Sequence, residues 1–354
     1  MPESGAPQSN EKPNAGSTEN ALAWYSEAPG DKLTGEVREL FVKYSGVPAE
    51  DVERHVCDVR DRAWKVLPYP CIGLFTFLRF ALARHPSYGR VLELLRPASR
   101  KLNSTESTGT DIQKPPRFLD LACCLGQDIR KLVYDGIPPS IVYGTDIKRE
   151  YLDLGFELFG DRDRYPDPDT QFFAADLFAA DAANNSHPET EAAAGVWREH
   201  EGKFAVIQAG NFLHLFDYDT QLRACCLIAR LLDPSPGSMI VGGQMGSSNP
   251  REIPRTGVLL EVPASKKTGE GDGQEGTVKI TAKYWHSPST FRQMWTEVGV
   301  RTGTKWDVEA RFIGVSEIAV SWERKQLESV LQRLGGPYNQ EDARYLTFAV
   351  TRVA

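Results

Sequence analysis

The chain of 354 residues lacks the features that mark membrane-spanning or secreted proteins. Its longest apolar stretch, Cys71–Ala83, is interrupted by Arg79 and is too short to span a bilayer. Residues 1–20 are rich in Pro, Ser, Asn, Gly and Glu and contain no apolar run of the kind a signal peptide needs, so we expect this tail to be disordered. These absences predict a soluble protein of the cytoplasm.

An excess of positive charge is also missing. Asp and Glu number 48 against 41 Lys and Arg, which gives a formal net charge of −7. An acidic chain has no general attraction for phosphate backbones, and no nucleic-acid-binding module is recognisable in the sequence. We therefore expect a small-molecule substrate and no nucleic-acid partner.

The six cysteines do not form a metal-binding or disulfide pattern. They occur as Cys57, Cys71 and the vicinal pairs Cys123-Cys124 and Cys225-Cys226, without any Cys-x-x-Cys or His/Cys spacing. Vicinal cysteines are poor disulfide partners, and these spacings do not suggest zinc. We expect reduced, small packing residues in a reducing compartment, and no bound metal.

One segment resembles a ligand-binding strand-turn-helix motif, although it lacks most of the glycines of that motif. The segment Phe118-Leu-Asp-Leu-Ala-Cys-Cys-Leu-Gly-Gln-Asp128 follows the pattern Asp-x-Gly-x-Gly-x-Gly with Asp120, Ala122, Cys124 and Gly126 at the four defined positions. Only the last glycine is kept, but alanine and cysteine are small enough for a backbone turn that approaches a ligand closely. The segment predicts a strand, a tight turn and the start of a helix.

Two later segments repeat the first part of this pattern. Ile141–Asp146 and Gln171–Asp176 are short apolar or aromatic runs that end in an aspartate, so that Asp120, Asp146 and Asp176 lie 26 and 30 residues apart. Ligands of doubly wound sheets bind at the carboxyl ends of the strands. Three strand-ending acids at βα spacing suggest the S-adenosyl-L-methionine (SAM) site of a class I methyltransferase.

Each acid can be given a role in that site. We expect Asp146 to accept hydrogen bonds from both ribose hydroxyls, Asp176 to accept one from the adenine amino group with Leu177 packed on the ring, and Asp120 to meet the methionine ammonium. The remaining residues expected to line the cofactor site are Ala122, Cys124, Gly126, Gln127, Ile147 and Ala209.

Two other interpretations compete with SAM binding. Any single aspartate could merely cap a helix or end a strand. NAD binding would favour a full Gly-x-Gly-x-x-Gly and an acid about 20 residues further on, and it would leave the third Asp-Leu unexplained.

The alternation of apolar runs and helical periodicity predicts an α/β fold, a class I, Rossmann-like methyltransferase sheet with an N-terminal helical cap. We divide the chain into a tail (1–20), a helical cap or lid (21–102), a linker (103–116), a SAM-binding core (117–250), a mobile insertion (251–283) and a C-terminal helix with antiparallel strands (284–354). The expected strands are Phe118–Ala122, Ile141–Thr145, Gln171–Ala174, Phe204–Gln208, Ser238–Gly242, Val308–Ile313 or Ile318–Trp322, and Tyr345–Val353.

Three other segments complete the predicted organisation. Asp181–His200 reads as a surface insertion, and Arg251–Lys279 reads as a mobile loop because it is rich in Gly, Lys and Glu. Helices are expected from Pro48, over Asp219–Leu232, and from Ser287 to a terminating Gly299.

The acceptor side of the site is expected after the fourth core strand. Asn211 and His214 follow the strand end at Gln208, where Asn211 could orient a ligand and His214 could contact the acceptor or act as a base. Six aromatic residues are candidates for an apolar roof over the acceptor, with core packing as the alternative: Trp64, Tyr69, Phe75, Phe77, Phe216 and Trp285.

Together with Gly144-Thr-Asp-Ile147, Ala175-Asp-Leu177 and Trp64…Pro68-Tyr-Pro-Cys-Ile-Gly73, these segments make the chain resemble the fungal meroterpenoid methyltransferases, of pathways such as those for terretonin, austinol and andrastin. The resemblance extends from about Trp24 to the C-terminus. It implies a SAM-binding α/β core, methylation of the free carboxyl group of a farnesylated aromatic polyketide acid, and a possible homodimer.

A carboxylate is already an anion at neutral pH, so the implied reaction needs positioning and exclusion of water but no strong base. Two alternatives stay open from the residues. One is a methyltransferase acting on a phenol or another hydroxyl with His214 as base, and the other is a non-enzymatic pathway partner that has lost SAM binding with its glycines.

Overall fold

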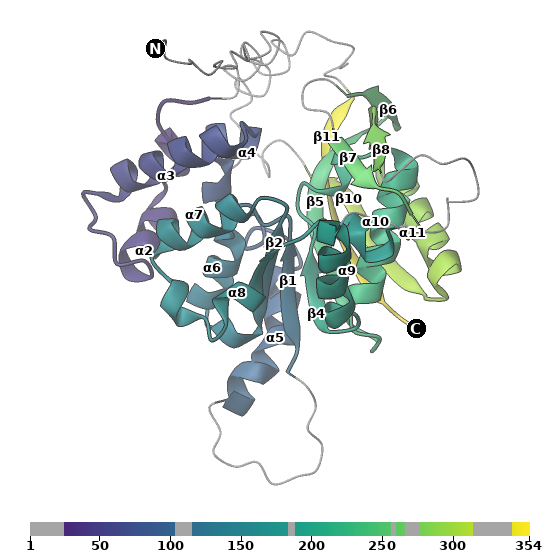
Figure 1. Cartoon of the computed structure of the whole chain (residues 1–354), viewed down its shortest axis with the longest axis horizontal. Coiled ribbons are helices and arrows are strands. Elements are labelled where there is room, and N and C mark those ends of the chain that lie inside the picture. The colour runs from purple at the N-terminus through teal and green to yellow at the C-terminus, as the bar shows by residue number, and fades with distance from the viewer. Residues whose placement is uncertain (1–24, 103–114, 183–187, 256–259, 266–276, 314–341) are drawn as a thin grey trace, which may run out of the picture.

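A computed structural model describes residues 25–102, 115–182, 188–255, 260–265, 277–313 and 342–354. At its centre lies a seven-stranded sheet in the order β10-β11-β5-β4-β1-β2-β3 (Figure 1). The strands are β1 (Arg117–Leu121), β2 (Val142–Asp146), β3 (Phe172–Ala174), β4 (Phe204–Gln208), β5 (Met239–Ser247), β10 (Trp306–Ile313) and β11 (Ala343–Arg352).

The strand order confirms the predicted fold class. Strands β1 to β5 pair in parallel, and β11 runs antiparallel between β5 and β10. From β1 the chain builds outward to β2 and β3 on one side and to β4 and β5 on the other, so the order reverses between β1 and β4. Ligands of open α/β sheets bind at such a reversal, outside the carboxyl ends of the strands.

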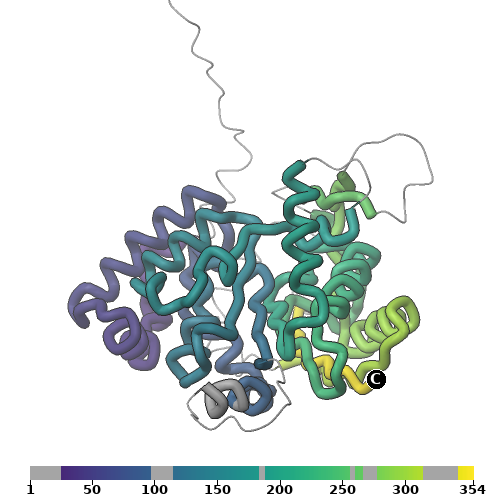
Figure 2. The backbone as a smooth tube through the Cα atoms, turned by 60° about the horizontal axis from the view of Figure 1, so that its bottom comes forward, coloured from purple at the N-terminus to yellow at the C-terminus, as the bar shows by residue number. Residues whose placement is uncertain are grey.

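Alternating side chains of the strands form two cores, because successive residues of a strand point to opposite faces of the sheet. Phe118 packs with α5 (Tyr88–Leu102), α6 (Gln127–Tyr134) and α7 (Arg149–Phe159), whereas Leu119 packs with α9 (Pro188–His200), α10 (Tyr218–Leu231) and α11 (Pro288–Thr302). The two groups of helices lie on opposite sides of the sheet, as Figure 2 shows. The fold is therefore a three-layer sandwich.

The N-terminal helices form a fourth layer outside α7. Helices α2 (Gly35–Lys43), α3 (Val52–Val66) and α4 (Pro70–Gly73) share a core with Leu154, Leu158 and Phe159 of α7. The ring of Phe41 stacks on Phe159 with centroids 5.4 Å apart. The predicted helical character of this segment is confirmed, although α3 begins four residues after Pro48.

Three sequence predictions were wrong: the surface insertion before His200, the end of the helix from Ser287 at Gly299, and the mobile loop from Arg251. Residues 188–200 do not belong to a surface insertion, because they form α9, whose buried Trp197 donates a hydrogen bond to Asp176 O at 2.7 Å. Helix α11 ends at Gly303, in the left-handed region, and Gly299 lies inside the helix.

The described part of 251–283 is also more regular than the predicted loop. It contains β6 (Arg251–Pro254) paired with β9 (Ala282–Trp285), and β7 (Leu260–Pro263) paired with β8 (Thr277–Ile280). The tail 1–20, most of the linker 103–116 and the alternative strand Ile318–Trp322 lie outside the described residues. Within the described ranges, no helix is long and apolar enough to cross a membrane.

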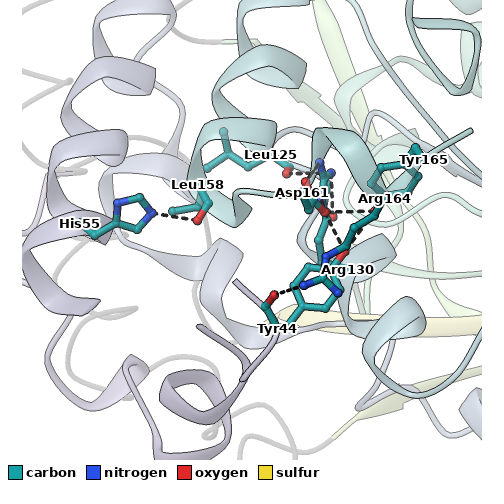
Figure 3. A network of polar contacts seen from close by, with 9 residues as sticks. Tyr44, His55, Leu125, Arg130, Leu158, Asp161, Arg164 and Tyr165 are labelled. Carbon is teal, nitrogen blue, oxygen red and sulfur yellow. Dashed lines mark hydrogen bonds and ion pairs between the residues drawn. The ribbon is translucent and has the colours of Figure 1, made fainter. Parts of the chain in front are cut away.

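A buried ion pair joins the cap to the sheet. Arg130 of α6 and Asp161, which follows α7, are both 1% exposed, and the guanidinium donates through Nε at 2.9 Å and Nη2 at 3.1 Å to the two carboxylate oxygens. The hydroxyl of Tyr44, at the end of α2, donates to the same carboxylate at 2.7 Å, and the hydroxyl of Tyr165 does so at 3.2 Å (Figure 3). Asp161 thus connects three elements that are distant in sequence.

The free edge of the Arg130 guanidinium faces the turn that precedes α6. Its Nη1 lies 3.4 Å from both Leu125 O and Gly126 O. Around this network, Arg164 donates to Tyr44 O at 2.5 Å, and the ring of His55 contacts Leu158 O through Nε2 at 2.8 Å (Figure 3). The ion pair therefore fixes the backbone of the turn and also the position of the cap relative to α6 and α7.

Asp161→Asn should unfold the protein at markedly lower denaturant. The substitution keeps the shape of the side chain but leaves the Arg130 charge buried without its counter-ion, which typically costs about 3–5 kcal/mol. Equilibrium urea denaturation measures this loss. The control is Asp169→Asn, because Asp169 pairs with Arg149 and Arg162 at an exposed position and should leave the midpoint almost unchanged. Equal midpoint shifts for both variants would contradict a central role for the buried pair.

Candidate active site

The predicted site residues of β1, β2 and β4 meet at one edge of the sheet. Asp120 stands opposite Gly144 of β2 and Gln208 of β4, and Asp146 is the last residue of β2. Because these strands are parallel, their carboxyl ends lie together at the strand-order reversal between β1 and β4. The structure therefore brings Asp120 and Asp146 together as the sequence predicted.

The turn after β1 has a backbone normally built from glycine. Ala122, Cys124 and Gly126 have φ values of 58°, 55° and 66°, so all three lie in the left-handed region. Gly126 is the N-cap of α6, and its N–H donates to Cys123 O at 2.8 Å. Alanine and cysteine thus adopt the conformation of the missing glycines, at a cost of roughly 1–2 kcal/mol for each L-residue.

Asp146 holds this turn against the end of β2. Its carboxylate accepts hydrogen bonds from Cys124 N and Lys148 N, both at 3.0 Å. Burial raises the pKa of Asp146, while the N–H donors of Lys148 and Cys124 oppose that rise. An ionised carboxylate has about four acceptor positions, so Asp146 keeps capacity for ligand hydroxyls.

A third acid completes an acidic cluster at the start of α6. Asp128 is 2% exposed and accepts from Leu82 N of the cap and from Gln208 Nε2, each at 3.0 Å. Asp120 Oδ2 is buried without a hydrogen-bond partner among the described residues. Burial, and then the charges of Asp128 and Asp146, raise the pKa of Asp120. Carboxyl groups this close favour a cationic ligand between them.

Arg79 brings an unpaired positive charge to the same edge. It belongs to the short helix η2 (Thr76–Arg79) of the cap, is 8% exposed, and its Nε and Nη1 have no hydrogen-bond partner within the described part of the chain. Burial lowers the pKa of Arg79 to about 10, and the charge of Asp31, followed by Tyr345, opposes this shift. The charges of Asp128 and Arg79 both act on Tyr345, so the guanidinium and the acidic cluster share this tyrosine as a neighbour.

The residues after β2 and β3 are placed differently from one another. Ile147 is 59% exposed beside Asp146, an unusual position for a large apolar side chain. Asp176 caps the short helix η5 (Leu177–Asp181) by accepting from Phe178 N at 2.9 Å, and burial raises its pKa. Leu177 is buried in the core of the α9–α11 face. The capping role that the sequence left open for Asp176 therefore accounts for one of its oxygens.

The segment after β4 runs alongside β5. Ala209 N and Asn211 N donate to Val241 O and Gly243 O at 2.9 and 2.7 Å. Asn211 has a φ of 52°, and its Oδ1 accepts from the Tyr345 hydroxyl at 3.3 Å. A left-handed non-glycine residue just past a strand end is typical of a constrained functional position.

His214 lies in η6 (Leu213–Leu215) in a desolvated, positively charged surrounding. Burial, and then the charges of Lys283 and Arg255, lower its pKa to about 3. Its Nδ1 is buried without a hydrogen-bond partner among the described residues. The imidazole is therefore neutral at physiological pH.

The predicted aromatic roof is only partly exposed. Trp64 and Tyr69 of the cap are half-buried, and burial raises the pKa of Tyr69 to about 12. The others are core residues, which is the alternative that the sequence left open: Phe75, Phe77, Phe216 and Trp285 are at most 6% exposed. The ring of Phe75 is covered by the Arg60 guanidinium at 4.0 Å.

All six cysteines are free thiols, as predicted, but only Cys123 and Cys225 are buried. Cys71 of the cap hydrogen-bonds to Cys124 of the turn, so the cap touches the turn directly. Within the ranges that the structure describes, no group of three His, Cys, Asp or Glu side chains could hold a metal ion.

Several residues of the site were missed in the sequence. Asp128 is the last residue of the segment Phe118–Asp128, and Gln208 is the last residue of an expected strand. Their positions beside the predicted cofactor site were the signal that could have found them. Arg79, Arg255, Lys283 and Tyr345 lie in segments read as apolar helix, loop or closing strand, and no local pattern marks them.

Comparisons with known proteins give a consistent result. Residues 24–78 match the family described as "Meroterpenoid methyltransferase N-terminal domain". The chain is 34% identical over 290 residues to O-methyltransferase phiE of Fungal sp. (strain ATCC 74256), covering 82% of this chain and 79% of that protein. It is 33% identical to O-methyltransferase atr3 of Stereocaulon alpinum (92% and 78% covered) and 31% identical to methyltransferase ausD of Penicillium brasilianum (77% and 80% covered).

Ala122→Gly should raise the stability of the protein. Glycine removes the left-handed strain of alanine, and the greater freedom of the unfolded chain offsets only part of this gain, so a net increase of about 0.5–1 kcal/mol is expected. Urea denaturation with an unchanged m-value measures it. The control is Ala174→Gly, at an exposed alanine without a positive φ, which should be destabilising. If both variants lost stability, Ala122 would not have the strained, left-handed backbone described above.

Proposed function

Since the chain belongs to the fungal methyltransferases of meroterpenoid pathways, we propose that it methylates the free carboxyl group of a farnesylated aromatic polyketide acid. The methyl donor of this family is SAM. The observation that carries the choice of a carboxyl acceptor is the state of His214, which is neutral and flanked by the cations Lys283 and Arg255. A homodimer stays a prediction from the resemblance.

The residues at the sheet edge fit SAM. The acidic cluster around the unpartnered Asp120 Oδ2 suits the ammonium and sulfonium charges, and the buried guanidinium of Arg79 suits the methionine carboxylate. Asp146 has acceptor capacity for the ribose hydroxyls. Exposed Ile147 offers an apolar surface to the adenine, and Asp176 keeps an oxygen beyond the one that caps η5.

When bound, SAM supplies an electrophilic methyl group: its transfer forms an O–CH₃ bond to the acceptor, breaks the S–CH₃ bond and leaves a neutral thioether. A carboxylate acceptor releases no proton in this step. The protein therefore has to hold the acceptor oxygen in line with the S–CH₃ bond and keep water away. Positioning of this kind lowers the activation barrier by several kcal/mol. Half-buried Trp64 and Tyr69 are suited to cover an apolar tail at this place.

His214 suits this reaction better than methylation of a phenol. A phenol has to lose a proton, and an efficient general base has a pKa near the working pH. With a pKa of about 3, His214 is a weak proton acceptor, but its neutral ring can position an acceptor oxygen. The cations beside it also favour a group that is already negative.

Two variants should separate two parts of the cofactor site. Asp146→Ala should weaken binding of S-adenosylhomocysteine (SAH) and of methylthioadenosine alike, because both ligands carry the ribose. Arg79→Met should weaken SAH binding by about 10- to 100-fold, the value of one charge-assisted contact, and leave methylthioadenosine unaffected because it lacks the amino-acid end.

Calorimetric titration measures both affinities, with Arg54→Met, at an exposed arginine of α3 that pairs with Asp51, as control. If wild-type protein bound neither ligand, the chain would be a pathway partner that has lost SAM. If Arg79→Met weakened both ligands equally, Arg79 would have a purely structural role.

The acceptor prediction concerns substrate choice and pH. Wild-type protein should methylate a farnesylated aromatic acid and leave the analogue without the carboxyl group, a simple phenol, unmodified. The kcat should show no inflection near the pKa of about 6.5 of free histidine, because His214 is neutral above its lowered pKa. His214→Ala should slow turnover through poorer positioning without abolishing it. Preference for the phenol, together with total loss in His214→Ala and an inflection near pH 6.5, would instead establish His214 as the base.

A further inference from the structure

Two basic side chains on the β6–β9 ladder point toward the acceptor side of the site. Ile253 stands opposite Lys283 in this ladder, and Arg255 N donates to Thr281 O at 2.9 Å, which continues the same register. Lys283 and Arg255 are therefore diagonal neighbours on one face of the ladder. Ile253 shares that face and is 3% exposed, so the face is turned into the protein.

The ladder is fixed directly against the segment that carries His214. The Arg255 guanidinium donates to Leu215 O, and Tyr284 N donates to Phe216 O at 2.8 Å. Gln221 Nε2 of α10 binds both Phe216 O and Tyr284 O at 2.8 Å. These contacts hold the ladder beside the segment of His214, whose ring is within electrostatic range of both Lys283 and Arg255.

The positive charge of Lys283 is not balanced by an acid. Lys283 has no hydrogen-bond or ion-pair partner in the part of the chain that the structure describes, and it is only half-exposed. Burial, and then the charge of Arg255, lower its pKa to about 8. Lys283 is thus a half-buried cation without an acidic partner among the described residues, and an anion beside it would stabilise its protonated form.

Tyr69 of the cap is near both the basic pair and the cofactor site. Tyr69, just before α4, is close enough for its pKa to be influenced by Arg255 and also by Asp146 and Cys124. Tyr69 is therefore within electrostatic range of both Arg255 and the turn of the cofactor site. An acceptor group held at Lys283 and Arg255 would face the end of the cofactor site beside this tyrosine.

We propose that Lys283 and Arg255 form the binding site for the carboxylate of the acceptor, and that Lys283 determines the preference for an acid over a neutral acceptor. The inference rests on the proposed function and adds to it the residues that hold the reacting group. Lys283 supplies a mobile point charge and Arg255, fixed by Leu215 O, supplies the oriented donor. The two together would fix one carboxylate oxygen and leave the other for the transfer.

The test compares two acceptors on the SAH-loaded protein by calorimetric titration: a farnesylated aromatic acid and its primary amide, which has almost the same shape without the charge. Wild-type protein should bind the acid at least about 10-fold more tightly, the value expected from one charge-assisted contact. Lys283→Met should lose this preference, while its affinity for SAH should be unchanged. Lys283→Arg should keep the preference, because the positive charge is kept.

The matched control is Lys279→Met, at an exposed lysine of β8 that pairs with Glu261. This variant should behave as wild type with both acceptors. In steady-state assays, the KM of wild type for the acid should rise above pH 8, where Lys283 loses its proton in the absence of ligand. Among the described residues, the groups within electrostatic range of Lys283 are Arg255 and His214. Neither changes its charge in this range, because arginine stays protonated and His214 is already neutral. Lys283→Arg should remove the rise in KM.

The outcomes separate the inference from the proposed function. If wild-type protein neither bound nor methylated the acid, the proposed function would fail. If wild-type protein did both, and Lys283→Met still preferred the acid over the amide, the inference alone would be overturned. Inward-pointing lysines can also protect edge strands from pairing with other chains, so an Lys283→Met protein that self-associates with its acid preference intact would assign Lys283 that structural role instead.

Discussion

The buried pair of Arg130 and Asp161 is the contact on which the arrangement of the site depends. One guanidinium binds the carboxylate after α7 and lies beside two carbonyls of the turn, and the same carboxylate receives the hydroxyl of Tyr44 from the cap. Removing two charges from water is costly and is offset only by complete pairing. The price of this pairing is that the cap, the turn and the sheet must keep one relative position.

That fixed position keeps opposite charges apart across the site. Asp120, Asp128 and Asp146 gather where β1, β2 and α6 meet, whereas Lys283 and Arg255 lie on the β6–β9 ladder beside His214. Tyr69 lies within the influence of both groups. A cationic methyl donor would be attracted to the acidic part of the site and an anionic acceptor to the basic part. Electrostatic attraction would thus place the two ligands correctly before methyl transfer.

The strands of the sheet and the three acids could be predicted from the sequence because both are marked by local patterns. Apolar runs that end in aspartate predicted β1, β2 and β3, and the structure places Asp120 and Asp146 at neighbouring strand ends. Helix α9 was missed because its apolar face is short, although Trp197 is fully buried. Lys283 and Arg255 could not be found, since their role depends on strand pairing between positions that are 28 apart in a segment that looks like a loop. The left-handed φ of Ala122 and Cys124 is not a preference of alanine or cysteine, so the sequence indicated it only through the glycine positions that they occupy; in the structure Asp146 accepts a hydrogen bond from Cys124 N.

The separation of acidic and basic groups also bears on how the site would empty. In the proposed reaction a cation and an anion become a neutral thioether and a neutral ester, so both ligands lose the charge that each end of the site attracts. The acids around Asp120 would then lose the sulfonium charge and keep only the ammonium group and the ribose hydroxyls of the spent donor, and Lys283 would face an ester with no net charge. The same electrostatics that collects the reactants would thus favour departure of the products, and turnover would be helped without any movement of the rigid cap.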